Sequence, residues 1–408
     1  MNAPEVVAIV GASAAGVSAA ATLRTDGYRG RIVLIGDDVA APYDRPLLSK
    51  GYLAGAIGFD KLLLRPEAYW ADNNVELRLG VRAVDLDVAN RTLTLSDDSR
   101  VAADAVILAT GGRSRELSVP GAELAGVFGL RTLADSAAIR AAAANAEHAV
   151  IVGMGFIGAE VAATLRGMGI EVTVVEPLSV PLERVLGERV GAVVGGLHAE
   201  HGVQMIFGDG VVGFDGDGGR VREVATSSGS RLKADMVIVG VGMVPDTALV
   251  ADTAVELSNG ILVDEFARSS VEGIYAAGDV ANHFHPLYGR HVRTEHWTHA
   301  VDHGAVAARS VLGTAAPYDT VPWVWSDQYD LALQYAGMHT GWDALVVRGD
   351  LDARDAIAFY IRDEIPVAAV ALNRGRDMRR ALGILKRAQP VSVAALADDD
   401  TDLRTLLS

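Results

Sequence analysis

Two hydrophobic patterns divide the chain and predict its secondary structure. Short continuous apolar runs that end in glycine, such as AVILATGG at 105–112 and MVIVGVG at 236–242, are typical of strands buried on both faces of a parallel sheet. From about residue 317 onward the runs alternate instead, as in ALVVRG and DAIAFYI, with turn residues between them. This alternation predicts an antiparallel sheet with helices to one side.

The first apolar strand leads into a glycine-rich turn. In VVAIVGASAAGVSAAATLR, the residues Gly11, Ser13 and Gly16 stand between the strand and a small-residue helix. Gly11 permits a tight turn, small residues let the backbone approach a pyrophosphate, and Gly16 lets helix and strand pack closely. The helix N-terminus attracts the pyrophosphate. The next strand, IVLIGDD, brings Asp37 about twenty residues later, where an acceptor for ribose hydroxyls is expected.

The same arrangement recurs in mid-chain. IVGMGFIGAEVAATL at 151–165 contains Gly153, Gly155 and Gly158 in a Gly-x-Gly-x-x-Gly pattern, and the following strand VTVVE ends in Glu176. A single pattern of this kind often serves only packing. Two of them, each with its strand, helix and acidic residue, predict that the chain binds two dinucleotides.

A further apolar strand, GIYAAGDVA at 273–281, ends in Asp279, which suits either a helix cap or a ligand acceptor. Together these segments resemble the two-dinucleotide-binding flavoprotein superfamily that includes glutathione reductase. The resemblance implies that the first loop binds FAD, with Asp279 accepting hydrogen bonds from the ribityl chain, and that the second loop binds the nicotinamide nucleotide.

A chain of 408 residues with 44 glycines is long enough for two or three α/β domains. The resemblance implies a split FAD domain at 1–114 and 240–314, with a NAD domain at 115–239 inserted into it. A C-terminal α+β domain is expected at 315–408. The predicted fold class is therefore α/β, with two Rossmann-like dinucleotide-binding domains and a third domain.

Four longer segments narrow the family: PYDRPLLSKGYLAG at 42–55, LRTLADS at 130–136, EHWTHA at 295–300 and PWVWSDQYD at 322–330. With the two loops, they resemble the NADH-dependent ferredoxin reductases of bacterial oxygenase systems over essentially the whole chain. The resemblance also implies that Trp325 lies near the isoalloxazine. It implies that FAD is contacted by Ala15, Asp37, Lys50, Ala83, Arg131, Asp279 and Trp297.

Glu160 stands directly behind the second phosphate loop, flanked by small apolar residues. A buried glutamate needs a partner. The resemblance implies a catalytic pair of Lys50 and Glu160, in which the lysine stabilises the negative charge that arrives at the flavin with hydride. Two residues depart from the family pattern, Ser13 in the first loop and Leu47 in PLLSK, and neither removes a group with a chemical role.

The chain has no cysteine, which excludes disulfides, thiolate metal sites and redox dithiols, and no metal site is expected. The resemblance therefore implies electron transfer from NADH through FAD to a [2Fe–2S] ferredoxin that serves a cytochrome P450 or a ring-hydroxylating dioxygenase. Because Glu176 repels a 2′-phosphate, NADH is expected over NADPH, although Arg184 lies close in sequence.

A formal net charge of −16 argues against nucleic-acid binding and means that an acidic ferredoxin needs a local basic patch. The candidate patch residues are Lys61, Arg65, Arg290, Arg293, Arg374, Arg376, Arg379, Arg380, Lys386 and Arg387.

Two other functions stay open: an NADH oxidase or peroxidase, and a flavoprotein like apoptosis-inducing factor whose conformation responds to NADH. Without a long apolar run or a signal-peptide pattern, neither a membrane span nor export is expected, and the predicted location is the cytoplasm.

Overall fold

The computed structural model describes residues 4–339 and 341–407 and divides them into two compact units. Unit 1 comprises residues up to 44, 60–113 and 244–322, and unit 2 comprises 45–59, 114–243 and the chain from 323 onward. The short strands β8 (Gly112–Ser114) and β17 (Met243–Pro245) carry the chain across this division. The three predicted domain ranges stay a prediction.

Unit 1 is built on a parallel sheet with the strand order β19-β7-β1-β2-β3. Smaller sheets, β4-β5-β6 and β18-β20-β21, complete it. Its strands are β1 (Val6–Val10), β2 (Arg31–Gly36), β3 (Val75–Leu79), β4 (Ala83–Asp87), β5 (Thr92–Leu95), β6 (Arg100–Ala102), β7 (Ala105–Leu108), β18 (Ile261–Val263), β19 (Ile274–Ala276), β20 (Ala281–His285) and β21 (Arg290–Arg293). Its helices are α1 (Ala14–Thr25), α2 (Ala68–Asp72) and α6 (Trp297–Val311).

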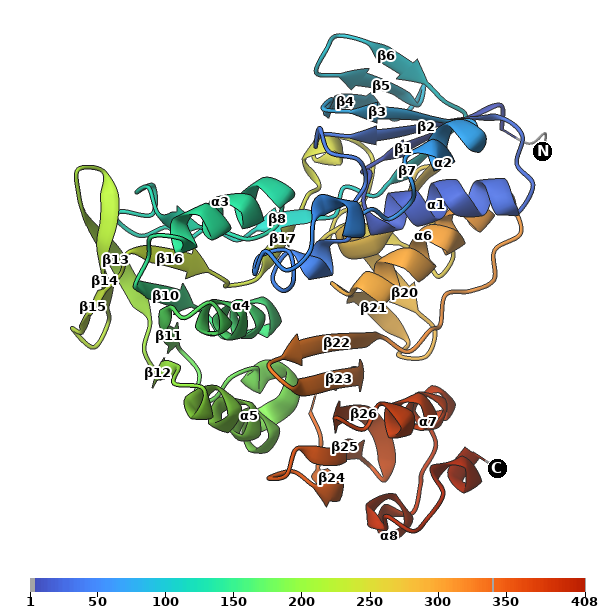
Figure 1. Cartoon of the computed structure of the whole chain (residues 1–408). Helices are drawn as coiled ribbons and strands as arrows, with labels where there is room; N and C mark the ends of the chain where they lie inside the picture. The colour runs from blue at the N-terminus through green and yellow to red at the C-terminus, as the bar shows by residue number, and fades with distance from the viewer. Residues whose placement is uncertain (1–3, 340, 408) are drawn as a thin grey trace. The chain divides into compact units, whose positions relative to one another are not determined.

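Both faces of this sheet are covered, as the continuous apolar runs predict. Ile9, Leu34 and Ile107 belong to the core beneath α1 and α6, whereas the neighbouring residues along each strand face the core that β4, β5 and β6 help to form. Figure 1 shows α1 and α6 side by side, and the two helices are in close contact. Gly304 of α6 permits this approach, since a Cβ there would lie 2.2 Å from the Ala15 carbonyl oxygen.

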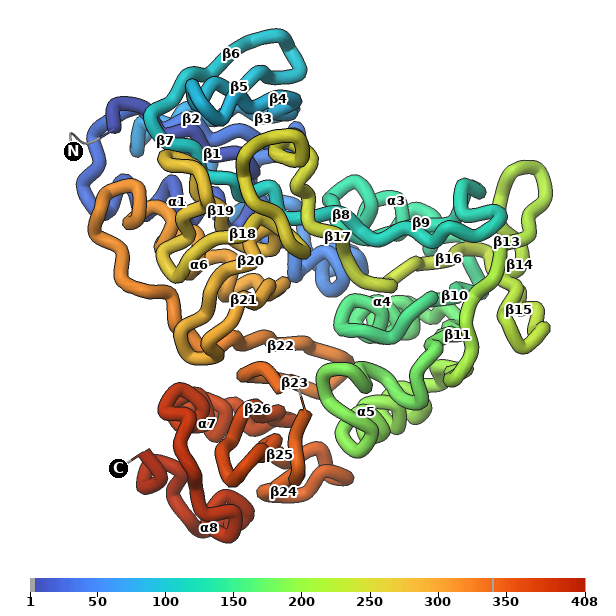
Figure 2. Tube along the Cα trace, turned by 180° about the vertical axis from the view of Figure 1, so that it is seen from behind, coloured from blue at the N-terminus to red at the C-terminus, as the bar shows by residue number. Residues whose placement is uncertain are grey.

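Unit 2 contains a second parallel sheet, ordered β12-β11-β10-β16-β9, and the antiparallel sheet β13-β14-β15, whose hairpins are easily followed in Figure 2. Its strands in this region are β9 (Val127–Phe128), β10 (His148–Val152), β11 (Glu171–Glu176), β12 (Gln204–Phe207), β13 (Val211–Asp217), β14 (Arg220–Thr226), β15 (Arg231–Lys233) and β16 (Met236–Val239). The helices are α3 (Leu133–Ala143), α4 (Phe156–Gly167) and α5 (Glu183–Glu200).

The C-terminal part of unit 2 is a five-stranded antiparallel sheet ordered β22-β23-β26-β25-β24, as the alternating pattern predicts. Leucine and valine side chains of α5 pack against this sheet, and α7 contacts β23 and β26. The strands are β22 (Trp323–Gln328), β23 (Leu331–Gly337), β24 (Ala344–Asp350), β25 (Asp355–Arg362) and β26 (Ile365–Leu372). Helices α7 (Gly375–Arg387) and α8 (Val393–Ala397) follow.

The predicted α/β fold class is confirmed. One strand of each parallel sheet, β1 or β10, leads into a glycine loop, and a C-terminal α+β region follows. Among the described residues, no helix combines the length and the apolar character that crossing a bilayer requires.

Candidate functional site

The first glycine loop in unit 1 has the geometry that a pyrophosphate requires. Gly11 adopts φ +115°, and a Cβ there would lie 2.1 Å from the Ala109 carbonyl oxygen, so only glycine fits. A Cβ on Gly16 would lie 1.9 Å from the Gly11 carbonyl oxygen, which explains the close packing of the turn against α1. Ser13 is the N-cap of α1, but its side chain makes no capping bond. The first N–H groups of this helix therefore receive no hydrogen bond from the Ser13 side chain, and the phosphate predicted to accept from them stays a prediction.

The structure brings Asp279 to this loop. The short 3₁₀ helix η4 (Gly278–Val280) holds Gly278 at φ +74°, where a Cβ would lie 2.9 Å from the Cβ of Ala15. Asp279 is half-buried beside that contact, and Trp297, also half-buried, is the first residue of α6. Ala15 and Asp279, two predicted FAD residues from distant parts of the sequence, thus lie near each other at the N-terminus of α1.

Asp37 and Ala83 both belong to unit 1, where Asp37 follows β2 of the parallel sheet and Ala83 begins β4 of a smaller sheet. Asp37 directly follows β2, and 62% of its side chain is exposed. Its Oδ2 lies 3.2 Å from Nη2 of Arg82, which immediately precedes Ala83 at the start of β4. The acidic residue is therefore positioned at the carboxyl edge of the sheet, where an open α/β sheet binds its ligand.

The second glycine loop, in unit 2, repeats this design. Gly153 adopts φ +90°, and a Cβ on Gly158 would lie 2.1 Å from the Gly153 carbonyl oxygen. Gly155 differs, because it has an ordinary φ of −75° and no atom lies within 4 Å of where its Cβ would stand. Nothing within the chain demands glycine at this position, whereas a nucleotide pyrophosphate approaching the start of α4 does. The loop therefore fits a bound dinucleotide.

Glu176, at the end of β11, holds this loop in shape. Its Oε2 accepts a hydrogen bond from the Met154 backbone N–H at 2.7 Å, and its Oε1 accepts one from the Leu178 N–H at 3.0 Å. The carboxylate is buried with 8% exposure and keeps further lone pairs for ribose hydroxyls. Glu176 is therefore both the predicted ribose acceptor and a support for the glycine loop.

Lys50 and Glu160, also both in unit 2, form the predicted pair. Lys50 Nζ lies 2.9 Å from Glu160 Oε1, and the two side chains are 17% and 4% exposed. The lysine also donates to the Pro46 carbonyl oxygen at 3.3 Å. Glu160 is a buried residue of α4 between small apolar residues, so its carboxyl group needs hydrogen-bonding partners within the protein.

Two serines complete the coordination of Glu160. Ser49 Oγ donates to its Oε2 at 2.5 Å, and Ser326 Oγ donates to its Oε1 at 2.7 Å. Thr164 of α4 in turn donates to the Ser49 carbonyl oxygen at 2.7 Å and fixes the PLLSK segment against the helix. Both serines lie in segments that the sequence singles out, but their role depends on contacts across more than a hundred residues, which no local pattern reveals.

The hydrogen-bonded chain extends beyond Ser326 through residues that the sequence analysis does not identify. Gln328 Nε2 donates to Ser326 Oγ at 3.1 Å, and Gln328 Oε1 lies 2.9 Å from His198 Nε2. Burial lowers the pKa of His198 to about 4, so its imidazole is neutral and Nε2–H donates to the amide oxygen. Each of these donors is aimed toward the Glu160 carboxylate, and such aligned bonds strengthen one another.

Arg131 lies in unit 2, directly before the N-cap of α3. Its backbone N–H donates to Asp135 Oδ2 at 2.9 Å, and Thr132 and Asp135 form a capping box around the helix start. Arg45 donates to the Arg131 carbonyl oxygen at 3.3 Å. The position of the arginine is thus well fixed, and its predicted contact with FAD phosphates stays a prediction.

The candidate docking residues differ in how far they are exposed. Arg293 is 11% exposed and paired with Glu295 at 2.7 Å, and Arg374 is 17% exposed between Asp355 and Asp399, so both are engaged within their own units. Arg65 and Arg380 are half-buried. The exposed members of the set are Lys61, Arg290, Arg376, Arg379, Lys386 and Arg387.

Two known sequence families match nearly the whole chain. The sequence pattern described as pyridine nucleotide-disulphide oxidoreductase matches residues 5–304, and the one described as reductase C-terminal matches residues 323–407. Rhodocoxin reductase from Rhodococcus erythropolis is 39% identical over 402 residues, 98% of this chain and 94% of that protein.

Two solved structures are similar throughout. The ferredoxin reductase for the CYP199A2 system from Rhodopseudomonas palustris has a TM-score of 0.96 at 36% identity, covering 99% of this chain and 100% of that one. The covalent putidaredoxin reductase–putidaredoxin complex has a TM-score of 0.96 at 34% identity, covering 100% of this chain and 99% of the matched chain.

Proposed function

We propose a function from one established premise: the chain belongs to the pyridine nucleotide-disulphide oxidoreductase family. It is an FAD-dependent oxidoreductase that transfers electrons from NADH to a [2Fe–2S] ferredoxin, which feeds a cytochrome P450 or a dioxygenase. The observation that carries this conclusion is the presence of two dinucleotide loops of matching geometry in one chain that has no cysteine. Electrons that reach the flavin must therefore leave to an external carrier rather than to a thiol.

In unit 1, we propose that FAD lies on the first glycine loop. Gly11, Ser13 and Gly16 admit the pyrophosphate, Asp37 accepts from the adenosine ribose, and Asp279 accepts from the ribityl chain. The close approach of Gly278 to Ala15 supports this arrangement, because it brings the adjacent Asp279 to the loop. A Cβ added to Gly278 would lie 2.9 Å from the Cβ of Ala15. Ala83, Arg131 and Trp297 stay proposed contacts of the cofactor.

In unit 2, NADH is proposed to bind at Gly153, Gly155 and Gly158. Glu176 then accepts the ribose hydroxyls and repels a 2′-phosphate, which favours NADH over NADPH. Bound FAD supplies the conversion between hydride transfer and one-electron transfer.

Lys50 provides positive charge to the reduced cofactor, and Glu160 is the positioning residue that keeps the ammonium group in place. The three groups around the pair, the Ser49 and Ser326 hydroxyls and the Pro46 carbonyl oxygen, support this role. They fix both side chains in advance, so the ammonium group needs no reorganisation when charge develops. Ser49 and Ser326 belong to the same positioning set.

Ferredoxin docking is proposed to use exposed basic side chains, because an acidic carrier would otherwise be repelled by the net charge of −16. Helix α7 carries Arg376, Arg379, Lys386 and Arg387, all exposed.

The proposed location is the cytoplasm, where NADH is produced.

The test is NADH-dependent reduction of a purified [2Fe–2S] ferredoxin by the FAD-loaded protein without oxygen. Reduction over many turnovers is expected. Rapid oxygen consumption without ferredoxin would identify an NADH oxidase instead. Slow reduction of every one-electron acceptor, with an NADH-dependent change in oligomeric state, would identify a flavoprotein like apoptosis-inducing factor.

A further inference from the structure

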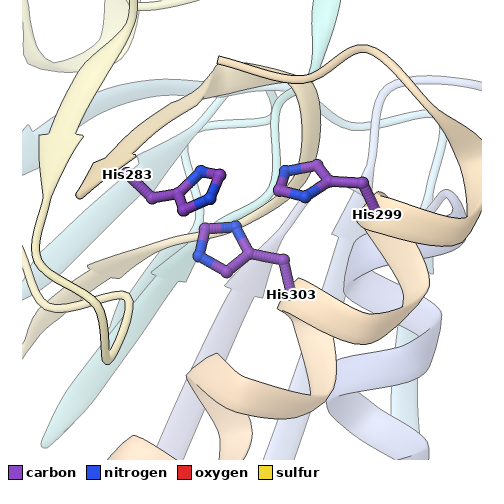
Figure 3. Close-up of side chains that lie close together, drawn as sticks. All are labelled: His283, His299 and His303. Atoms are coloured by element: carbon purple, nitrogen blue, oxygen red, sulfur yellow. The ribbon is translucent and has the colours of Figure 1, made fainter. Parts of the chain in front are cut away.

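Three buried histidines meet inside unit 1, and none of them has a role in the proposed FAD or NADH sites. His283 projects from β20, and His299 and His303 project from α6, where a spacing of four residues puts them on one face of the helix. Figure 3 shows the three rings turned toward one another. Their side chains are almost inaccessible, with exposures of 0%, 2% and 0%.

Most ring nitrogens of the three histidines have no well-formed hydrogen bond. Both ring nitrogens of His283, both of His303 and Nε2 of His299 are buried without one, although backbone groups of Val292 and Gly278 lie close enough to His283 and His299 to favour the charged form and so raise the pKa of each imidazole against the larger lowering effect of burial. Every neutral imidazole carries one N–H group, and leaving such a buried group unsatisfied costs about 1–3 kcal/mol. A ligand that uses the ring nitrogens would remove part of that cost.

Ring packing does not remove that cost. His283 and His299 are stacked with centroids 5.0 Å apart, and His303 is stacked on Tyr318 at 5.0 Å. Stacking covers the faces of the rings but provides no hydrogen bonds to the nitrogens at their edges. The neighbouring His285 is bound differently, since its Nε2 lies 3.0 Å from the Thr320 carbonyl oxygen.

The hydrogen bond made by His299 shows which of its nitrogens is available. Its Nδ1 lies 3.1 Å from the Tyr318 hydroxyl. If Nδ1–H donates to that oxygen, Nε2 presents its lone pair to the other two histidines. A metal-binding histidine is typically held in this way, by a second hydrogen bond that fixes the tautomer and the orientation of the ring.

We propose that His283, His299 and His303 bind one divalent transition-metal ion of the zinc class. One ligand nitrogen from each ring lies within 4.8 Å of the others. Zn–N bonds of about 2.0–2.1 Å in tetrahedral geometry place ligand nitrogens about 3.4 Å apart. Rotations of the side chains about χ1 and χ2 bring them closer by the required distance, about 1.4 Å at most.

The ligand chemistry selects the class of ion. Three neutral imidazoles suit Zn²⁺, Co²⁺ or Ni²⁺, whereas Mg²⁺ and Ca²⁺ require oxygen ligands. The ion would link β20 to α6 and thereby fix the segment between them, so its role is structural. A water molecule is expected as the fourth ligand.

The experiment uses the full-length holoprotein without a histidine tag, prepared from zinc-supplemented cells and desalted. Metal content is measured by inductively coupled plasma mass spectrometry. About one zinc per chain is expected in the wild type, and His283→Asn and His303→Asn should each lower the occupancy at least tenfold. His285→Asn is the matched control, because it removes a buried histidine of the same region that is not a ligand, and it should retain zinc.

A second measurement needs only the wild-type chain. After removal of metal with a chelator, adding Zn²⁺ should raise the Tm by several degrees, since a ligand that binds only the folded state stabilises it. X-ray absorption at the zinc edge should show imidazole nitrogen ligands. The proposal is overturned if the wild type contains less than a tenth of an equivalent of metal and Zn²⁺ leaves the Tm unchanged. Zinc retained equally by the histidine variants would also overturn it.

Discussion

Replacing Lys50 and Glu160 in turn should distinguish their proposed roles, since Lys50 supplies the positive charge and Glu160 holds the ammonium group in position. At 2.9 Å and an effective dielectric constant of about 20, the Coulomb attraction between the two is about 6 kcal/mol before desolvation is counted. Removing one partner of a buried pair typically lowers the free energy of unfolding by about 3–5 kcal/mol. Because Lys50 is 17% exposed, we expect a loss of about 3 kcal/mol of stability in either single variant.

In Lys50→Met, we expect NADH to reduce the bound flavin about 100-fold more slowly, which matches the loss of one preorganised group that stabilises developing charge. In Glu160→Gln, the ammonium group remains but keeps only the Pro46 carbonyl oxygen at 3.3 Å as its anchor. The reduction should then slow about tenfold, or about 1.4 kcal/mol in the activation barrier.

The assay is anaerobic stopped-flow measurement of flavin bleaching at saturating NADH. Because Glu160 is proposed to act only by positioning Lys50, the double variant should be no slower than Lys50→Met alone. Lys61→Met is the matched control, since its side chain is 72% exposed, and it should reduce its flavin at the wild-type rate. A wild-type rate in Lys50→Met with full flavin content, or multiplied losses in the double variant, would refute the reasoning.

Three further predictions concern the nucleotide loop and the docking surface. Gly155→Ala should raise KM for NADH at least tenfold while Tm and flavin content stay unchanged, because its Cβ would enter only the space proposed for the pyrophosphate; Gly167→Ala in the same helix is the control, and equal KM values would contradict this. Glu176→Gln should lower the ratio of kcat/KM for NADH to kcat/KM for NADPH about tenfold, a change of about 1.4 kcal/mol. An unchanged ratio would show that the Glu176 carboxylate does not select between the two nucleotides. Arg379→Glu should slow ferredoxin reduction severalfold at low salt and spare ferricyanide reduction, whereas Arg222→Glu, an exposed charge on β14, should affect neither; equal losses with both acceptors would reject docking at α7.

The two glycine loops could be predicted from the sequence because each has a local pattern, an apolar strand followed by closely spaced glycines and a small-residue helix. The steric demand on Gly158 is also local, since its Cβ would meet the Gly153 carbonyl oxygen, whereas the demand on Gly11 comes from the distant Ala109 carbonyl oxygen and could not be predicted from the pattern. The approach of Asp279 to Ala15 was implied only by resemblance, because it depends on how α6 and η4 pack against α1.

Long-range polar contacts could not be predicted in this way. Ser326 reaches Glu160 across 166 residues, and the Gln328–His198 bond spans 130. An apolar pattern specifies which face of a strand is buried but not which buried polar groups meet. Arg293 pairs with Glu295 and is only 11% exposed, a degree of burial that the local pattern does not indicate, and its docking role stays a prediction.

The most direct test of the central claim, that one chain carries NADH electrons through FAD, is an anaerobic titration of the purified protein with NADH followed by absorbance. The purified protein should be yellow, and about one equivalent of NADH should bleach its flavin. A protein that holds no flavin, or a flavin that NADH leaves oxidised, would contradict it.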